Sequence, residues 1–290
     1  MLDVLNQQPW LLIITLVSLG LVVGSFLNVV IYRLPLMMDS RWRKDCCELL
    51  ELEHKQDSDT SLSLSHPNSH CPHCKAGIKP WQNIPVLSYL FLGGKCGNCG
   101  AAISIRYPIV ELATALMTLA LMLQYDASPE LLGAMIFTWS LISLTMIDID
   151  HHLLPDDITL PLLWLGLAFS VFGASVSLSD AVLGAMLGYL SLWSVYWLFK
   201  LATGKEGMGY GDFKLLAALG AWLGWQSIPM IILLSSLVGA AVGIALMVAT
   251  KRGKDAPIPF GPYLAMAGWI TLMWGDTILA FYMGATGLNS

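Results

Sequence analysis

Two acidic clusters lie at the ends of long apolar runs, where carboxylates could act together in hydrolysis. The first spans residues 148–157, and the second is Gly209-Tyr-Gly211-Asp212-Phe-Lys214. Ionisable side chains at the margins of membrane segments are costly, so they are functional candidates. Two carboxylates held close together share one proton, so that one can activate a water while the other polarises a carbonyl. The pairing of these clusters predicts aspartyl hydrolysis of a peptide bond.

A structural role is the alternative for each acid. Asp148 or Asp150 could end a helix, and Asp156 and Asp157 are placed to cap the next one, which is the role that we favour for those two. Glycine next to aspartate also forms ordinary turns. Asp212 is therefore a catalytic candidate only in combination with the first cluster.

Four cysteines form a second candidate site. Two C-x-x-C pairs, separated by 21 residues, have the spacing of a tetrahedral zinc site. The pairs are Cys71 with Cys74 and Cys96 with Cys99. Four thiolates leave no open position, so the pattern favours structural zinc over catalytic zinc, with redox-active or unliganded thiols as alternatives. We expect His70 and His73 to be exposed loop residues.

The composition places the chain in lipid. Of 290 residues, 56% are hydrophobic and only 12% charged, with a mean hydropathy of +0.66. Soluble domains carry about 25% charged residues. The net charge of −5 also excludes a nucleic-acid-binding domain, which requires excess basic charge.

Eight apolar runs are near the length of a membrane-spanning helix, about 20 residues. They cover residues 10–31, 108–123, 131–147, 158–173, 181–199, 213–223, 228–249 and 261–284. The chain is therefore predicted to be an all-α, polytopic membrane protein of about eight helices. The run 213–223 is the shortest and could be re-entrant.

The basic residues orient these spans. All fifteen Lys and Arg residues fall in the segments 33–106, 200–214 and 251–254. Eight spans place these segments on one side, which is the cytoplasmic side by the positive-inside rule. Both termini are then periplasmic, and the acids of 148–157 and 209–212 face the cytoplasm.

The polar stretch after the first run predicts an inserted domain. We expect a first transmembrane helix over 1–32, a cytoplasmic zinc-binding tetracysteine domain over 33–107, and a seven-helix membrane peptidase domain over 108–290.

With these motifs in place, the sequence resembles the bacterial type IV prepilin peptidases, GxGD-type aspartyl proteases that are also N-methyltransferases and that serve type II secretion. The likeness covers nearly the whole chain. Besides the C-x-x-C pairs, it rests on Gly24-Ser-Phe-Leu-Asn28 with Arg33-Leu-Pro35, Arg106-Tyr-Pro-Ile-Val-Glu111, Ile147-Asp148 with Leu154-Pro155-Asp156, Gly209-Tyr-Gly211-Asp212, and Pro259-Phe-Gly-Pro-Tyr263.

The resemblance implies two catalytic aspartates. Asp212 belongs to the Gly-x-Gly-Asp motif, in which Gly209 and Gly211 support it. The other is the first acid of a segment that ends at Pro155, which is Asp148, with Asp150 as the rival assignment.

The resemblance also implies an activity. Such proteins remove a short basic leader from prepilins and pseudopilins at the inner membrane, and then methylate the new amino terminus with S-adenosylmethionine. No glycine-rich dinucleotide fingerprint is present, so the methyl-donor site falls to the region 24–111 by resemblance alone. Asn28, Arg33, Arg106 and Glu111 lie there, and interface anchoring or ion pairing is an equal alternative for them.

Two other functions compete with this one. A polytopic transporter would use the acids as ion ligands, although no symmetric pair of broken helices is evident. A zinc-ribbon scaffold would only recruit secretion components.

Overall fold

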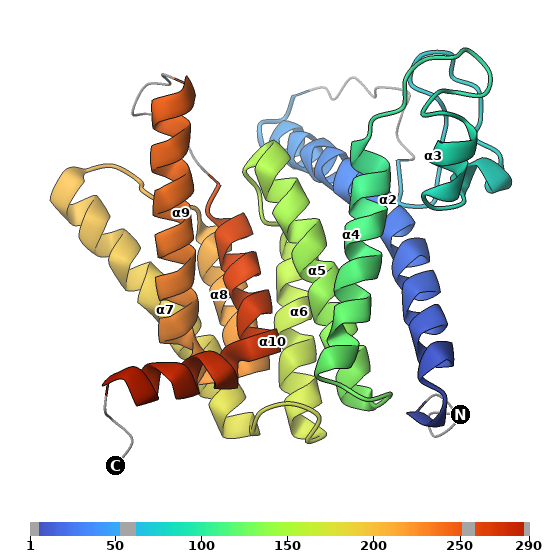
Figure 1. Ribbon diagram of the computed structural model, residues 1–290. Coiled ribbons are helices and arrows are strands. Elements are labelled where there is room, and N and C mark those ends of the chain that lie inside the picture. The colour runs from blue at the N-terminus through green and yellow to red at the C-terminus, as the bar shows by residue number, and fades with distance from the viewer. Residues whose placement is uncertain (1–5, 53–61, 251–258, 287–290) are drawn as a thin grey trace. The chain divides into compact units, whose positions relative to one another are not determined.

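The computed structural model describes residues 6–52, 62–250 and 259–286 (Figure 1). The chain divides into two compact units, Met1–Leu123 and Gln124–Ser290. Within the described residues all regular elements are helices, and the only β contacts are two isolated bridges beside the cysteines, His70 with Gly77 and Lys95 with Ala102. The predicted all-α class is confirmed.

The first unit is built on two helices, α2 (Pro9–Leu49) and α4 (Arg106–Ala120). Between them lie η1 (Pro80–Asn83) and the short α3 (Leu87–Phe91), and η2 (Leu121–Leu123) continues α4. The expected boundary at residue 32 falls inside α2, because the helix continues through its polar second half, where Arg43 pairs with Asp39 one turn away at 2.9 Å. The three-domain division itself stays a prediction.

Small residues let α2 and α4 approach closely. A Cβ added to Gly20 would lie 2.7 Å from the Ala115 Cα, and one added to Gly24 would lie 2.7 Å from the Glu111 Cα. Glycines four residues apart bring membrane helices into backbone contact. Gly24 therefore fixes the position of Glu111, a buried carboxyl group.

The second unit surrounds one short helix. Its elements are α5 (Pro129–His151), α6 (Asp156–Val171), α7 (Leu178–Thr203), α8 (Tyr210–Leu223), η3 (Trp225–Ser227), α9 (Ile228–Thr250) and α10 (Gly261–Thr286). Helices α6, α7 and α10 all pack against α8, which is buried almost all round from Phe213 to Trp222 except for Lys214. A helix that is apolar on every face belongs in the core, and this one carries Asp212 in its first turn.

The predicted apolar runs lie in helices, except that the run 158–173 continues two residues past the end of α6 at Val171. Among the described residues, six helical segments are long and apolar enough to cross a membrane: Pro9–Leu49, Arg106–Leu123, Pro129–His151, Leu178–Thr203, Trp225–Ala249 and Gly261–Phe281. Helices α6 and α8, with 16 and 14 residues, are not among them. At about 1.5 Å per residue, α8 is shorter than a hydrocarbon layer of about 30 Å.

Candidate active site

Asp148 and Asp212 lie at two helix ends that the fold brings together. Asp148 is in the last turn of α5 and Asp212 in the first turn of α8. Their side chains are only 5% and 7% exposed. Leu154 lies close both to Gly211, the residue before Asp212, and to Gly261, which contacts the Asp148 carboxyl group. The two acids therefore lie at adjoining helix ends. Two acids 64 positions apart in sequence thus form one buried pair.

Asp148 and Asp150, the two acids in the last turn of α5, differ in burial. The helix ends at His151 because His152 adopts a left-handed conformation, φ 51°, from which its N–H donates to the Asp148 carbonyl. Asp148 faces the interior of the unit, whereas Asp150, two residues further along, is exposed. His151 and His152 are also exposed.

Asp212 is hydrogen-bonded through its backbone, but one of its carboxyl oxygens is not. Helix α8 starts after Gly209, whose carbonyl accepts from the Asp212 backbone N–H at 3.3 Å. Over the described ranges, Oδ1 of Asp212 is the one buried side-chain oxygen or nitrogen that has no hydrogen-bond partner. Leaving such an atom unpaired is costly, and a native structure that retains it calls for an explanation such as a catalytic role.

The partner of Asp148 comes from α10. The Gly261 N–H donates to Asp148 Oδ2 at 3.0 Å in a buried contact. A Cβ at Gly261 would lie 2.6 Å from that same oxygen. Gly261 belongs to the motif Pro259–Tyr263, in which the sequence alone assigns it no role. Nothing local in the sequence links it to Asp148, 113 residues away.

Leu154, in the loop between α5 and α6, contacts Gly211 in the Gly209–Asp212 motif and Gly261 in the Pro259–Tyr263 motif. Pro155 is the residue that caps the start of α6. Before it, Leu154 lies so close to Gly211 that an added Cβ there would be 2.8 Å from the Leu154 Cβ. A Cβ at Gly209 would have ordinary contacts only, with Asp212 Oδ2 at 3.7 Å. A side chain therefore does not fit at position 211, whereas one would fit at position 209.

The capping role expected of Asp156 and Asp157 is wrong. Both are in the first turn of α6, but Pro155 occupies the cap position and no side-chain cap bond forms. Asp156 instead accepts from Lys214 Nζ at 2.7 Å, which links the first turn of α6 to the N-terminal part of α8. Acidic residues in a first turn still favour the helix through its dipole.

The four predicted cysteines form one cluster in the first unit. Their sulfur atoms all lie within 4.8 Å of one another. The same turn occurs twice: the Cys71 N–H donates to Ala76 and the Cys96 N–H to Ala101, at 2.9 and 2.8 Å. The turn residues Lys75 and Gly100 both have positive φ. Two equal knuckles that present four thiols are a metal-binding arrangement.

The pKa values of the clustered thiols move in opposite directions. A hydrogen bond from the Asn98 side chain lowers the pKa of Cys74 to about 6, whereas desolvation and the neighbouring thiols raise the pKa of Cys99 to about 11. All six cysteines are free thiols, which argues against a disulfide. His70 and His73 are exposed, as predicted, and do not belong to the cluster.

The buried polar residues of the first unit hold the inserted segment. Arg33 donates to the carbonyls of Ser63 and Pro67 at 2.9 and 2.6 Å. Glu111 Oε2 accepts from the Val86 N–H at 2.8 Å, and Asn28 Nδ2 donates to the Tyr107 carbonyl at 3.1 Å. Backbone groups are thus the hydrogen-bond partners of these three side chains.

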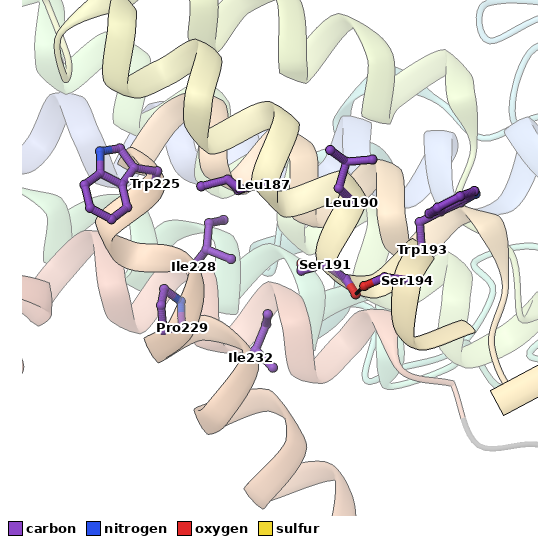
Figure 2. Close-up of a pocket in the computed structure, with 9 residues that line it drawn as sticks. All are labelled: Leu187, Leu190, Ser191, Trp193, Ser194, Trp225, Ile228, Pro229 and Ile232. Carbon is purple, nitrogen blue, oxygen red and sulfur yellow. Dashed lines mark hydrogen bonds between the residues drawn. The ribbon is translucent and has the colours of Figure 1, made fainter. Parts of the chain in front are cut away.

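An apolar groove in the second unit lies between α7 and the start of α9 (Figure 2). Leu187 and Leu190 line one wall, and Trp225 and Ile232 the other. The groove contains no acid, histidine or cysteine, so it is not the chemical site.

Taken together, the helical membrane fold and the buried carboxyl pair define the class of multi-pass aspartyl peptidases of membranes. Residues 18–125 match the bacterial peptidase A24 N-terminal domain, and residues 135–244 match the type IV leader peptidase family.

Full-length relatives are more specific. Over 289 residues the chain is 53% identical to the prepilin leader peptidase/N-methyltransferase of Pseudomonas aeruginosa, covering 100% of this chain and 99% of that protein. The enzymes of the same name from Aeromonas hydrophila and Legionella pneumophila are 52% and 46% identical, with coverage of 98% and 96% of both chains. The chain therefore belongs to the prepilin leader peptidase/N-methyltransferase family, and it is a multi-pass inner-membrane enzyme. No solved structure matches it.

Family membership confirms the resemblance inferred from the motifs. It also leaves the transporter and the recruitment scaffold without support, because the relatives are named as enzymes.

Proposed function

We propose that this chain removes the basic leader from type IV prepilins and type II secretion pseudopilins, with Asp148 and Asp212 as its catalytic residues. The observation that carries the assignment is the burial of these two carboxyl groups at adjoining helix ends, while the rival Asp150 is exposed. The names of the relatives support the reaction, since they describe leader peptidases of prepilins.

The pair has the chemistry to hydrolyse an amide. With one proton shared between them, one carboxylate removes a proton from water as its oxygen attacks the carbonyl carbon. The other carboxyl group gives its proton to the carbonyl oxygen. When the tetrahedral intermediate collapses, the C–N bond breaks and the leaving nitrogen takes a proton from the pair. The products are a free carboxylate on the leader and a free amine on the pilin.

The new amine is the substrate of a second reaction in this proposal. S-adenosylmethionine would supply the methyl group for this nitrogen, which would lose a proton in exchange. We assign this step to the first unit, because a separate family domain matches residues 18–125. The buried side chains of Arg33 and Glu111 order the inserted segment there, and no residue is assigned to the methyl donor.

The tetracysteine cluster is proposed to hold one structural Zn²⁺. Four thiolate donors suit zinc and fill its tetrahedral shell, leaving no position for a catalytic water. The metal would link the two knuckles and so stabilise the inserted segment.

The proposed orientation follows the basic residues, with both termini periplasmic and the carboxyl pair at the cytoplasmic face. The basic segment 251–254 and both chain ends lie outside the described residues. A prepilin is anchored by an apolar helix, so its cleavage site would reach the pair at the membrane surface.

The test is mass spectrometry of a prepilin amino terminus after incubation with the purified enzyme, with and without S-adenosylmethionine. Asp148→Asn and Asp212→Asn, each nearly isosteric, are expected to abolish cleavage at unchanged protein level. The matched control is Asp150→Asn, which should retain cleavage. Processing by either of the first two variants would refute the pair as assigned.

A further inference from the structure

The start of α10 directs a backbone donor at the proposed catalytic pair. The first N–H groups of a helix have no partner within the helix. In α10 the N–H groups of Tyr263 and Leu264 donate to the Phe260 carbonyl, at 3.1 and 3.2 Å, and Pro262 has no N–H. The Gly261 N–H is therefore the first-turn donor left over, and it donates to Asp148 Oδ2 at 3.0 Å.

Space, as well as bonding, requires glycine at this position. A Cβ at residue 261 would lie 2.6 Å from Asp148 Oδ2, 3.2 Å from Asp148 Cγ and 3.0 Å from Leu154 Cδ2. Real Cβ atoms do not approach other atoms at 2.6 Å, so a side chain there would displace the carboxyl group. Shifting a buried carboxylate has a cost, because its hydrogen bond to the Gly261 N–H is lost.

The contact also has a favourable electrostatic direction. The N-terminal end of a helix carries partial positive charge, which stabilises a nearby carboxylate. Helix α10 packs against both α5 and α8, the helices that bear the two acids. One hydrogen bond thus connects the orientation of Asp148 to a third helix of the unit.

We propose that Gly261 is a positioning residue of the peptidase. Its N–H holds Asp148 Oδ2 so that the carboxyl group stays oriented towards Asp212, and its lack of a side chain leaves room for that arrangement. The inference rests on the proposed function, since it assumes that Asp148 acts in cleavage.

The first experiment compares two glycines of the same helix. In Gly261→Ala the kcat for prepilin cleavage is expected to fall about 100-fold with KM within about twofold, because a small misplacement of a reacting group costs about that much. The control is Gly268→Ala, whose Cβ would also meet an atom at 2.6 Å, Leu219 Cδ2, but no acid. It should retain the kcat of the wild type. A Gly261→Ala enzyme with normal kcat would overturn the proposal.

A second experiment stays informative if Gly261→Ala is poorly folded. The loss of melting temperature caused by Gly261→Ala is measured in the wild type and in the Asp148→Ala background. The loss should fall to about half or less in that background, because the closest atom is gone, whereas the loss caused by Gly268→Ala should be unchanged. Equal losses for Gly261→Ala in both backgrounds would overturn the proposal.

These outcomes separate the two proposals. Cleavage by Asp148→Asn would refute the proposed function, while the melting measurements would still report on the contact. An inactive Asp148→Asn beside a fully active Gly261→Ala would refute the role of Gly261 alone.

Discussion

Gly184 of α7 and Gly220 of α8 place two helix backbones in direct contact, and this contact sets the position of the helix that bears Asp212. A Cβ on either glycine would overlap the carbonyl oxygen of the other. Four residues along α7, Gly188 repeats the pattern against Leu216, where a Cβ would lie 2.9 Å from the carbonyl carbon. Small residues at such spacing are how membrane helices pack most closely.

Gly184→Leu is accordingly expected to destabilise the second unit by about 1–3 kcal/mol, the usual cost of overpacking, and to reduce cleavage by moving α8. Thermal unfolding and prepilin processing measure the two effects. Leu183→Ala, on the exposed face of the same helix, is the control and should change neither by much. Equal behaviour of the two variants would contradict the packing account.

The two glycines before Asp212 are expected to differ. Gly211→Ala should lower the rate of cleavage at least about tenfold, because its methyl group would be forced into Leu154, on the loop that follows Asp148. Gly209→Ala should have a distinctly smaller effect, since its methyl group has ordinary contacts. Cleavage rates of the two variants at matched protein level decide the matter. A larger loss for Gly209→Ala would show that conformation, rather than space, governs this turn.

Metal content tests the tetracysteine cluster. Wild-type protein purified under reducing conditions is expected to contain about one zinc per chain by elemental analysis, and Cys71→Ser should lose most of it because three thiolates bind more weakly than four. Cys46→Ser, which changes an exposed cysteine outside the cluster, should keep its zinc. Wild-type protein without zinc would end the metal assignment.

The strained backbone at Val86 predicts a specific role for Glu111. Val86 has φ 58°, an unfavourable conformation for a β-branched residue, and its N–H is held by Glu111 Oε2. Glu111→Ala should destabilise the first unit by about 1–3 kcal/mol, as expected for a partly buried donor left unpaired. Glu111→Gln keeps an oxygen that accepts the bond and should lose less.

Thermal unfolding and N-methylation of a pre-cleaved pilin are the measurements for these two variants. If Glu111→Gln abolishes methylation at wild-type stability, the carboxylate has a chemical role in addition to the structural one.

Local features of the sequence determined the membrane fold and the two candidate sites. The apolar runs predict helices because a helix satisfies its own backbone within lipid, whatever surrounds it. The C-x-x-C pairs predict a cluster because each knuckle is a short-range turn. The acids are functional candidates because they lie at the ends of apolar runs, and the motifs around them indicate the family.

The tertiary structure decided what depends on contacts between distant segments. It buried Asp148 and exposed Asp150, two positions that the sequence alone could not rank, because the answer depends on which side of α5 meets its neighbours. It extended α2 to Leu49 and made Pro155, not Asp156 or Asp157, the cap of α6. It also brought the Gly261 N–H to Asp148 across 113 positions. Side-chain burial and hydrogen bonds between helices arise only when the helices pack, so no periodicity or spacing within one segment encodes them.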